Sequence, residues 1–302
     1  MKRNFINQSV IDSSPYLSKA ASIRELNKGF SHDEKYVIDE KYLLRIFSSE
    51  ADEQRREEFF YINQAAAYSS YVPETIDYQT LTEVGASYML LTYLPGIDGE
   101  EALKELTEDE QYQGGVLAGK ELKKLHQIPA PADQPDWYTF KKKKSNRYLA
   151  ALEKIELDPS IKELLGSYIL ENEKLMKGRP NTFQHDDFHP ANLLIHNKTF
   201  NGIIDFQRMD WGDPLHDLHK LGFFSKPVSI PFTRGIIDGY HDNRPVSEQF
   251  WELYALYSAM HVVSAIVWSQ NMDTKEKLLT YSRDVINDHE QFTRKVPKWY
   301  AH

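Results

Sequence analysis

The sequence predicts an α+β protein of two lobes, in which a small β-rich lobe with one main helix precedes a larger, mostly helical lobe. Short runs of β-branched and aromatic residues fill the first ninety positions, apolar residues recur at helical spacing after them, and Pro95-Gly96 separates the two patterns. A chain of 302 residues is long enough for two lobes. We therefore expect one lobe over residues 1–94, a second over residues 95–302, and a substrate cleft between them.

The first lobe is expected to contain short strands around a single helix. Four β-rich runs predict strands: residues 36–39, 42–47, 75–78 and 88–94. The polar pair Glu40-Lys41 predicts a hairpin turn between the first two. Residues 51–68 carry apolar side chains at helical spacing and predict the helix, which ends before Pro73.

The second lobe is expected to be built mainly from helices. Apolar spacing predicts helices over residues 108–126 and 160–177, with a proline-rich connector over residues 129–135. Two short apolar runs, residues 193–195 and 202–204, predict a pair of strands, and further helices follow to the C-terminus.

One stretch, residues 250–268, is apolar enough to be compared with a membrane span. It contains Glu252 and His261 and lacks flanking basic anchors, so it predicts a buried helix and no membrane association.

Composition excludes several classes of function. The chain has 36 Lys and Arg against 45 Asp and Glu, a net charge of −9, which disfavours a nucleic-acid surface and favours cationic ligands. It has no cysteine, which excludes disulfides, thiolate metal sites and a cysteine nucleophile. No secretory signal follows Lys2 and Arg3, so we expect a cytoplasmic protein. The oligomeric state is left open.

Polar residues around the two short strands of the second lobe predict phosphoryl transfer. Asp187 and Asn192 lie five positions apart before the first strand, and Asp205 follows the second. Because the ends of paired strands lie close together, Asn192 and Asp205 can place oxygens on one cation while Asp187 faces a substrate hydroxyl. Hard oxygen donors hold Mg²⁺ between phosphates, and a carboxylate can orient the attacking hydroxyl and accept its proton.

This arrangement resembles the aminoglycoside phosphotransferase and choline kinase-like families, distant relatives of protein kinases. Their first signature is a His, an Asp two residues later and an Asn five beyond, matched by His185, Asp187 and Asn192. The second signature is matched by Asp205-Phe206, Gly212-Asp213-Pro214 and Asp217.

The resemblance implies a bilobal protein kinase-like fold and a role for each matching residue. Asp187 would be the catalytic base or hydroxyl-orienting residue, and Asn192 and Asp205 would hold Mg²⁺. Asp217 would support the catalytic loop. His185 is expected to be structural, bonded to backbone near Asp205.

The first lobe carries weaker signals for a nucleotide, which by the resemblance is ATP or GTP. Ser31, in the loop over residues 28–33, would lie near the β-phosphate. Arg45 stands where the kinase-like fold places the cation that meets the α- and β-phosphates. Kinases commonly have Lys there, and the planar guanidinium of Arg is a different donor. Its expected partner is Glu58, with Glu57 as the alternative.

The segment between the lobes resembles the linker that meets the nucleotide base. Backbone groups of Thr92, Tyr93 and Leu94 would pair with the purine edge. Three apolar side chains are expected to cover the faces of the base: Val37, Leu44 and Ile204.

The expected acceptor is a hydroxyl of an aminoglycoside-like or other amino-bearing small molecule, with Asp210 and Trp211 as candidate pocket residues. Related enzymes act on choline, ethanolamine, amino acids, methylthioribose and sugars, so these acceptors stay open. A different alternative is a nucleotide-binding regulatory protein without catalysis. A third, a metal hydrolase, would use five polar residues: His185, Asp187, His189, His196 and Asp205.

Two positions depart from the family pattern, and one basic run needs an interpretation. Asp186 and Gln207 stand where glycines are usual, and we expect the Asp186 side chain to face solvent rather than the pocket. The basic run, Lys141 to Lys144 with Arg147, predicts a solvated helix face, with an anion or partner patch as the alternative.

Overall fold

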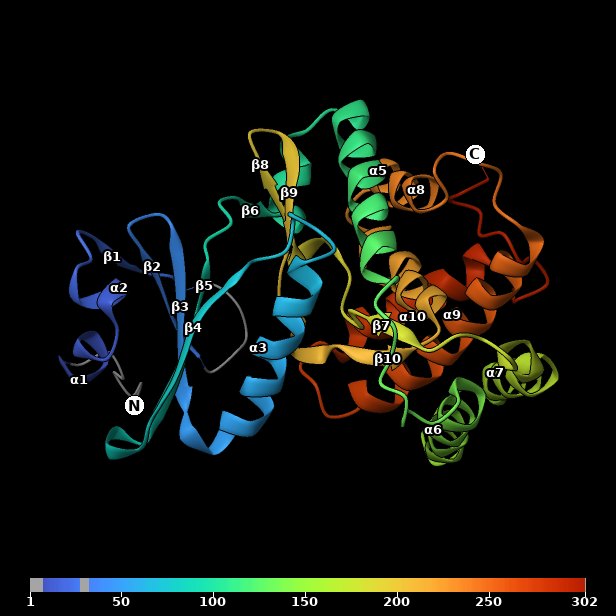
Figure 1. The fold of residues 1–302 in the computed structure, drawn as a ribbon. Helices are drawn as coiled ribbons and strands as arrows, with labels where there is room; N and C mark the ends of the chain where they lie inside the picture. The colour runs from blue at the N-terminus through green and yellow to red at the C-terminus, as the bar shows by residue number, and fades with distance from the viewer. Residues whose placement is uncertain (1–7, 28–32, 302) are drawn as a thin grey trace.

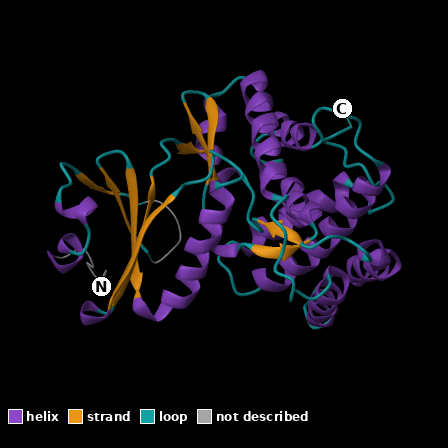
Figure 2. Cartoon of the chain, viewed as in Figure 1, coloured by secondary structure: helices purple, strands orange, loops and turns teal. Residues whose placement is uncertain are grey.

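The computed structural model describes residues 8–27 and 33–301 and has the predicted α+β class (Figures 1 and 2). A five-stranded antiparallel sheet in the order β1-β2-β3-β5-β4 forms the amino-terminal lobe. Its strands are β1 (Ile23–Glu25), β2 (Glu34–Ile38), β3 (Tyr42–Ser48), β4 (Thr75–Leu81) and β5 (Ala86–Thr92). The four predicted strands are present, and β1 extends the sheet at its edge.

The two faces of this sheet carry different side chains, because successive residues of a strand point to opposite sides. Tyr36 and Leu44, paired across β2 and β3, pack with Val10 and Leu17 from the short helices α1 (Gln8–Asp12) and α2 (Pro15–Ser18). The turn that joins β2 to β3 has positive φ angles at two residues, Asp39 and Glu40. The opposite face of the sheet turns toward α3 and the second lobe.

Helix α3 (Asp52–Ala66) corresponds to the helix predicted over residues 51–68 and lies between the sheet and the helical lobe (Figure 1). Its first residue fixes it to the sheet, because Oδ1 of Asp52 accepts hydrogen bonds from Ser87 at 2.6 Å and Thr80 at 2.8 Å. On its other side Tyr61 packs edge-on against Trp211, with ring centroids 5.3 Å apart. The helix therefore connects the two lobes.

The second lobe contains six longer helices and two small sheets in the part of the chain that is described. The helices are α5 (Glu108–Leu125), α6 (Trp137–Leu152), α7 (Pro159–Asn172), α8 (Ile230–Tyr240), α9 (Glu248–Ser269) and α10 (Lys275–Asp288), and a short α4 (Gly99–Ala102) precedes them. One sheet has the order β6-β8-β9, and β10 pairs with β7 in the other. These strands are β6 (Ile97–Asp98), β7 (Thr182–Gln184), β8 (Leu193–His196), β9 (Thr199–Ile203) and β10 (Asp210–Gly212).

Helices α5 and α8 approach each other through glycines on both contact faces. A Cβ atom on Gly115 or Gly119 would lie 2.1 Å from a carbonyl oxygen of α8. A Cβ atom on Gly235 or Gly239 would lie 2.2 or 2.0 Å from a carbonyl oxygen of α5. Only residues without a Cβ allow this backbone contact, since side chains would otherwise hold the helices 8–10 Å apart.

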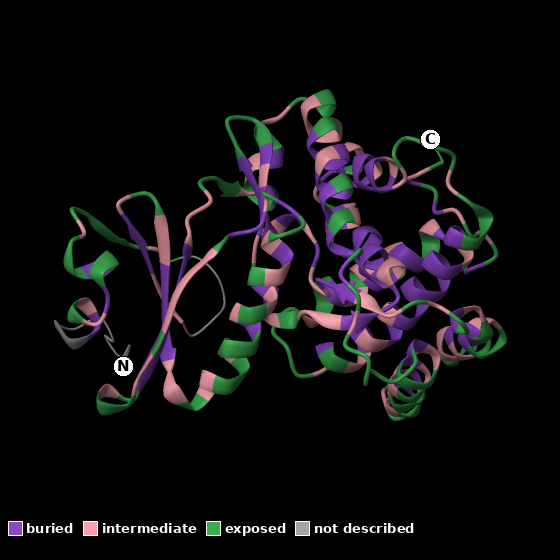
Figure 3. Ribbon diagram, in the orientation of Figure 1, coloured by how far each residue is buried: buried purple, intermediate pink, exposed green. Residues whose placement is uncertain are grey.

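Helix α9 is long and apolar enough to cross a membrane, but 78% of its most apolar window is buried inside the protein. Figure 3 shows the surrounding helical lobe with buried residues concentrated along its inner surfaces. This burial agrees with the predicted core helix. The predicted lobe boundary near residue 94 stays a prediction; the chain leaves β5 at Thr92 and next joins the second lobe through β6, which pairs with β8.

Candidate active site

The loop over residues 185–192 leads from β7 toward β8 and is held at its start by a buried carboxylate. Asp217 accepts hydrogen bonds from the backbone N–H of His185 at 2.7 Å and of Asp186 at 2.8 Å. The Asp217 side chain has no exposed surface. These two bonds fix the backbone immediately before Asp187.

Asp217 is itself positioned by a second layer of polar groups. Its Oδ2 lies 3.0 Å from Nε2 of His126, and Nδ1 of His126 lies 2.8 Å from the hydroxyl of Tyr240. Burial raises the pKa of Asp217, but the hydrogen bond from His126 and the backbone donors outweigh burial and lower it. The carboxylate is therefore ionised and rigidly placed.

His185 joins the loop to the strand that precedes Asp205. Its Nδ1 accepts the backbone N–H of Asp187 at 3.3 Å, so the opposite nitrogen carries the proton of the neutral ring. That nitrogen, Nε2, donates to the carbonyl oxygen of Ile204 at 3.0 Å. Burial lowers the pKa of His185, which favours this neutral form.

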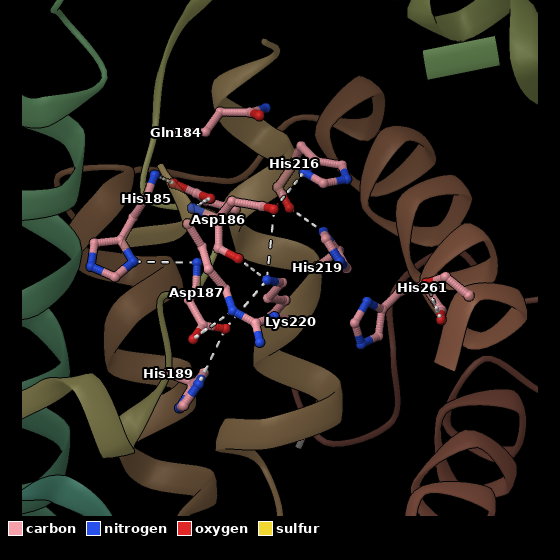
Figure 4. A network of polar contacts seen from close by, with 12 residues as sticks. Gln184, His185, Asp186, Asp187, His189, His216, His219, Lys220 and His261 are labelled. Atoms are coloured by element: carbon pink, nitrogen blue, oxygen red, sulfur yellow. Dashed lines mark hydrogen bonds and ion pairs between the residues drawn. The ribbon is translucent and has the colours of Figure 1, made fainter. Parts of the chain in front are cut away.

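Asp187 lies among hydrogen-bond donors and cationic side chains, including His189 and Lys220 (Figure 4). Nδ2 of Asn192 donates to its carbonyl oxygen at 2.9 Å and to its Oδ2 at 3.1 Å. Nε2 of His189 and Nζ of Lys220 lie 3.4 and 3.5 Å from its Oδ1, and Nε of Arg208 lies 3.9 Å from its Oδ2. Burial raises the pKa of Asp187, but the hydrogen bond and charge of His189 and the charges of Lys220 and Arg208 outweigh burial and hold the pKa well below its usual range.

Asp186 has a backbone conformation that explains why glycine is usual at its position. Its φ is +50°, in the left-handed region that glycine adopts most easily. The expectation that its side chain faces solvent is wrong. Its Oδ1 lies 3.6 Å from Nδ1 of His216 and 3.7 Å from Nζ of Lys220, because the segment on both sides of Asp217 brings these two groups to it.

Lys141 also departs from the sequence prediction. The predicted solvated helix face exists on α6 for Lys143 and Arg147, which are exposed, but Lys141 points inward and is 8% exposed. Its Nζ is hydrogen bonded to Nε2 of His216. Burial, with the nearby charge of Lys144, lowers the pKa of Lys141 to about 7.

Asn192 and Asp205 lie at the same end of the β8–β9 pair. The strands pair Leu193 with Ile203, and the N–H of Ile204 donates to the carbonyl oxygen of Asn192 at 3.0 Å. Asp205 is exposed and has a φ of +65°. Because the Asn192 amide nitrogen is turned to Asp187, its amide oxygen is left for another partner.

This donor set fits a hard cation. An amide oxygen and a carboxylate are oxygen ligands of the kind that Mg²⁺ takes while it keeps waters and substrate phosphates in its other positions. Within the described residues, no three His, Cys, Asp or Glu side chains converge on a metal site. The metal-hydrolase alternative is therefore wrong, and His196, one of its proposed ligands, is exposed at the end of β8.

In the first lobe Arg45 belongs to a buried cluster of four charged side chains, which we call the arginine–carboxylate cluster: Asp33, Arg45, Arg55 and Glu58. Nη1 of Arg45 donates to Glu58 at 2.7 Å, while Nε and Nη2 donate to Asp33 at 3.0 and 2.5 Å. Arg55 donates to Glu58 at 2.7 Å and to Asp33 at 2.6 Å. The partner on α3 is thus Glu58 and not Glu57, which is exposed.

Sequence reasoning missed Asp33 and Arg55. The signal was weak, because each lies on a different element and neither belongs to a motif. Ser31, the other phosphate candidate of this region, lies outside the described residues.

The linker has fewer backbone donors for a base than the sequence predicts. The N–H of Thr92 donates to the backbone carbonyl oxygen of Glu74 at 2.9 Å, and that of Tyr93 donates to the backbone carbonyl oxygen of Lys41 at 2.7 Å. These two groups are engaged by the protein, so among the three linker residues a base would meet carbonyl oxygens and Leu94.

The apolar residues expected around the base do not share one face of the sheet. Val37 pairs with Leu43, and Leu44 faces the core formed with α1 and α2. The prediction that Val37 and Leu44 sandwich a base is wrong, because adjacent residues of a strand point to opposite faces.

Asp210 and Trp211 lie on β10, next to the 185–192 loop through the pairing of Asp210 with Gln184. Burial raises the pKa of Asp210. Trp211 is 8% exposed and packs against Tyr61 and Phe183, so most of its surface belongs to the core between the lobes. Asp210 is the better placed of the two to meet a ligand.

A β-rich lobe facing a helical lobe, with an aspartate-bearing loop and a polar strand end between them, defines a kinase-like phosphotransferase. A family model described as the phosphotransferase enzyme family matches residues 22–251. The chain belongs to that family, and it is a small-molecule kinase that transfers a phosphoryl group to a hydroxyl. No curated protein sequence matches the chain.

Solved structures similar to this chain are aminoglycoside phosphotransferases, at identities that establish the fold alone. The ADP-bound APH(2'')-Ib is 18% identical with a TM-score of 0.63, over 98% of this chain and 99% of the other. The GDP complex of aminoglycoside 2'-phosphotransferase-IIIa is 16% identical with a TM-score of 0.69, over 94% and 99%. A mutant of APH(4)-Ia with AMP-PNP and hygromycin B is 15% identical with a TM-score of 0.65, over 93% and 98%.

Proposed function

We propose that this protein transfers the γ-phosphoryl group of ATP or GTP to a hydroxyl of an aminoglycoside-like or other amino-bearing small molecule, with Mg²⁺. The observation that carries the proposal is the placement of Asp187. Its carboxylate is buried on one side, bonded to Asn192, and held by a loop that Asp217 fixes from behind. Positioning of this kind accounts for most of the catalysis in phosphoryl transfer.

The chemistry of Asp187 favours orientation over early proton transfer. Its pKa lies well below its usual range, so it is ionised and weakly basic before reaction. A carboxylate of this kind accepts a hydrogen bond from the attacking hydroxyl and aims an oxygen lone pair at the phosphorus. It takes the proton as the bond to phosphorus forms and the hydroxyl becomes acidic. Lys220, 3.5 Å from its Oδ1, keeps the carboxylate charge balanced.

Asn192 and Asp205 would hold Mg²⁺ on the other side of the phosphates. The ion would neutralise charge on the phosphate oxygens, as it does in kinase-like enzymes. The contribution of this chain is to keep the two oxygen ligands at one end of the β8–β9 pair, beside Asp187.

An amino-bearing acceptor is supported by two observations. Similar structures hold streptomycin, gentamicin or hygromycin B. Asp210, whose strand pairs with the start of the loop, supplies a carboxylate near the site that a cationic amine could use. Choline, ethanolamine, amino-acid and sugar acceptors share the hydroxyl and remain the alternatives to be assayed.

Replacing Asp187 tests the proposal and separates it from the silent regulatory alternative. Asp187→Ala should lower the rate of nucleoside diphosphate release, measured with Mg²⁺ across a panel of hydroxyl acceptors, by about 10²- to 10⁴-fold. Nucleotide affinity, measured by calorimetry, should stay near that of the wild type.

The matched control is Asp273→Ala, which removes an exposed carboxylate of the same lobe and should leave both measurements unchanged. Turnover retained in Asp187→Ala would overturn the role of Asp187. A wild type that binds nucleotide but transfers phosphate to no acceptor would favour the regulatory alternative.

A further inference from the structure

The kinase-like site of this chain has a lysine on a strand where the sequence analysis placed no function. Lys35 lies on β2 and pairs directly with Arg45 of β3 across the antiparallel ladder. Residues that pair in this way project from the same face of the sheet. Lys35 and Arg45 therefore both face α3 and the second lobe, opposite the face that Tyr36 and Leu44 bury against α1 and α2.

Arg45 is poorly placed to bind phosphates, although it occupies the position expected for that cation. Three of its five N–H donors are engaged by Asp33 and Glu58 at 2.5 to 3.0 Å, and its side chain is only 7% exposed. The arginine–carboxylate cluster contains two positive and two negative side chains, so its charges cancel. Moving Arg45 onto a phosphate would leave Asp33 and Glu58 short of a partner in a buried place, which is costly.

Lys35 lies beside this neutral cluster, because it pairs with Arg45 across the ladder. Burial and the charge of Arg45 lower its pKa, while the carboxylates of Asp205 and Asp33 act in the opposite direction. Asp205 belongs to the second lobe and follows β9, so Lys35 lies within electrostatic reach of a proposed magnesium ligand of the other lobe. A polyphosphate held by a cation on Asp205 would therefore experience the positive charge of Lys35.

We propose that Lys35, and not Arg45, is the residue that binds the phosphates of the nucleotide. Lys35 supplies a compact charge with three donors, which suits phosphate oxygens from different directions. Arg45 instead holds Asp33 and Glu58 together and fixes α3 against the sheet. This inference rests on the proposed function, since it assigns a role within the same nucleotide site.

The test compares the affinities of variants for two ligands that share a base and differ in phosphates. Lys35→Met keeps the length of the side chain and removes the charge. Its affinity for ATP with Mg²⁺, measured by calorimetry, should fall by about 10- to 100-fold, as expected for the loss of a charge-assisted hydrogen bond. Its affinity for adenosine should stay unchanged. Lys35→Arg should recover most of the ATP affinity, because the positive charge is restored.

Three further variants define what the result means. Lys19→Met removes an exposed lysine of the same lobe and should change neither affinity. Arg45→Met should lower the melting temperature clearly, because it leaves buried carboxylates with fewer partners. Arg45→Lys keeps a positive charge in the cluster and supplies a second, less disruptive measurement of ATP affinity at that position.

Three results would overturn the proposal. Lys35→Met could bind ATP as tightly as the wild type. It could lose ATP and adenosine affinity equally, which would indicate a structural role. The folded Arg45→Lys protein could lose as much ATP affinity as Lys35→Met while it keeps its affinity for adenosine. A wild type that binds no nucleotide would contradict the proposed function itself, and the wild-type titration distinguishes this from the first three results.

Discussion

The arginine–carboxylate cluster of the first lobe and the polar network around Asp187 in the second lobe use similar side chains for different ends. In the cluster, each ion pair is 2.5 to 2.7 Å long and the four side chains are 2% to 11% exposed. Around Asp187, the ion pairs with His189, Lys220 and Arg208 are 3.4 to 3.9 Å long, and its side chain is 20% exposed. In the cluster, the charged groups bind one another and are shielded from solvent. Around Asp187, the ion pairs are long and the carboxylate is partly exposed.

This difference indicates which region can accept a substrate without reorganising. Charges in a closed and neutral cluster already have good partners, so a ligand would have to replace them. Long ion pairs at a partly exposed carboxylate leave room for a hydroxyl to approach and form a shorter bond. We therefore expect substitutions in the cluster to change stability first and those in the network to change turnover first.

The largest effect is expected from Asp217, which belongs to the network but is as buried as the cluster. In Asp217→Asn, one backbone N–H of His185 or Asp186 would face an amide NH₂ in place of an acceptor, and His126 would lose its charged partner. The free energy of unfolding, measured by urea titration, should fall by about 3–5 kcal/mol. Turnover of the remaining folded protein should also fall.

The control for this prediction is Asp242→Asn, which removes an exposed carboxylate paired with Lys123 and should be close to neutral. An Asp217→Asn protein as stable and active as the wild type would contradict the view that this carboxylate holds the loop.

A smaller effect is expected when the cluster loses one charge. Glu58→Gln keeps the shape of the side chain but leaves Arg45 and Arg55 sharing one carboxylate, Asp33. The free energy of unfolding should fall by about 2–3 kcal/mol, because the group is buried and bonded to both arginines.

Glu57→Gln is the matched control, since Glu57 is the exposed neighbour on the same helix and its carboxylate accepts a hydrogen bond from the Tyr61 hydroxyl at 3.3 Å. Equal melting temperatures for the two variants would show that the cluster does not stabilise the lobe. Loss of turnover in Glu58→Gln without any loss of stability would contradict the expectation that substitutions in the cluster change stability first.

The parts of the site that the sequence predicts best are those set by short-range geometry. Asp187 and Asn192 are five residues apart on one loop, and Asp205 is brought near them by a single strand pair, so spacing and pattern were sufficient. Glu58 was predicted because the family resemblance pairs the strand residue Arg45 with a glutamate of the next helix. The sequence marks Asp186 as a departure from the glycine usual at its position. The direction of its side chain depends on Lys220 and His216, and the local sequence does not reveal that they lie beside it.

The same reasoning explains what was missed in the fold. Strand β6 has two residues, and only its pairing with β8 makes it a strand. Each of α5 and α8 carries two glycines four residues apart, yet nothing in either helix alone indicates that they pack against each other. Lys141 was assigned to a solvated face because it begins a basic run, whereas its burial follows from the position of α6 over His216.

The smallest predicted effect concerns Lys141, which is hydrogen bonded to His216 of the polar network around Asp187. Its pKa lies near neutral pH. Its pKa is about 7 in the folded protein against an ordinary value of 10.5. Burial and Lys144 lower it, and Lys220 acts in the same direction, while Asp186 and Asp210 oppose them. Between these two pH values the unfolded chain binds a proton that the folded protein does not bind. The free energy of unfolding should therefore rise with pH through this window. Below pH 7 the lysine is protonated in both states, so the destabilisation from burying its charge is complete there.

Replacing Lys141 by methionine should remove this contribution. The free energy of unfolding of the wild type, measured at pH 7.5, 8.5 and 9.5, should rise relative to that of Lys141→Met by up to about 1 kcal/mol per pH unit. Lys143→Met, on the exposed side of the same helix, should keep the wild-type slope. Parallel curves for the wild type and Lys141→Met would show that the lysine reaches solvent and is not part of the network. A difference confined to pH values above 7 would show that Lys141 is buried and loses its proton near neutral pH in the folded protein.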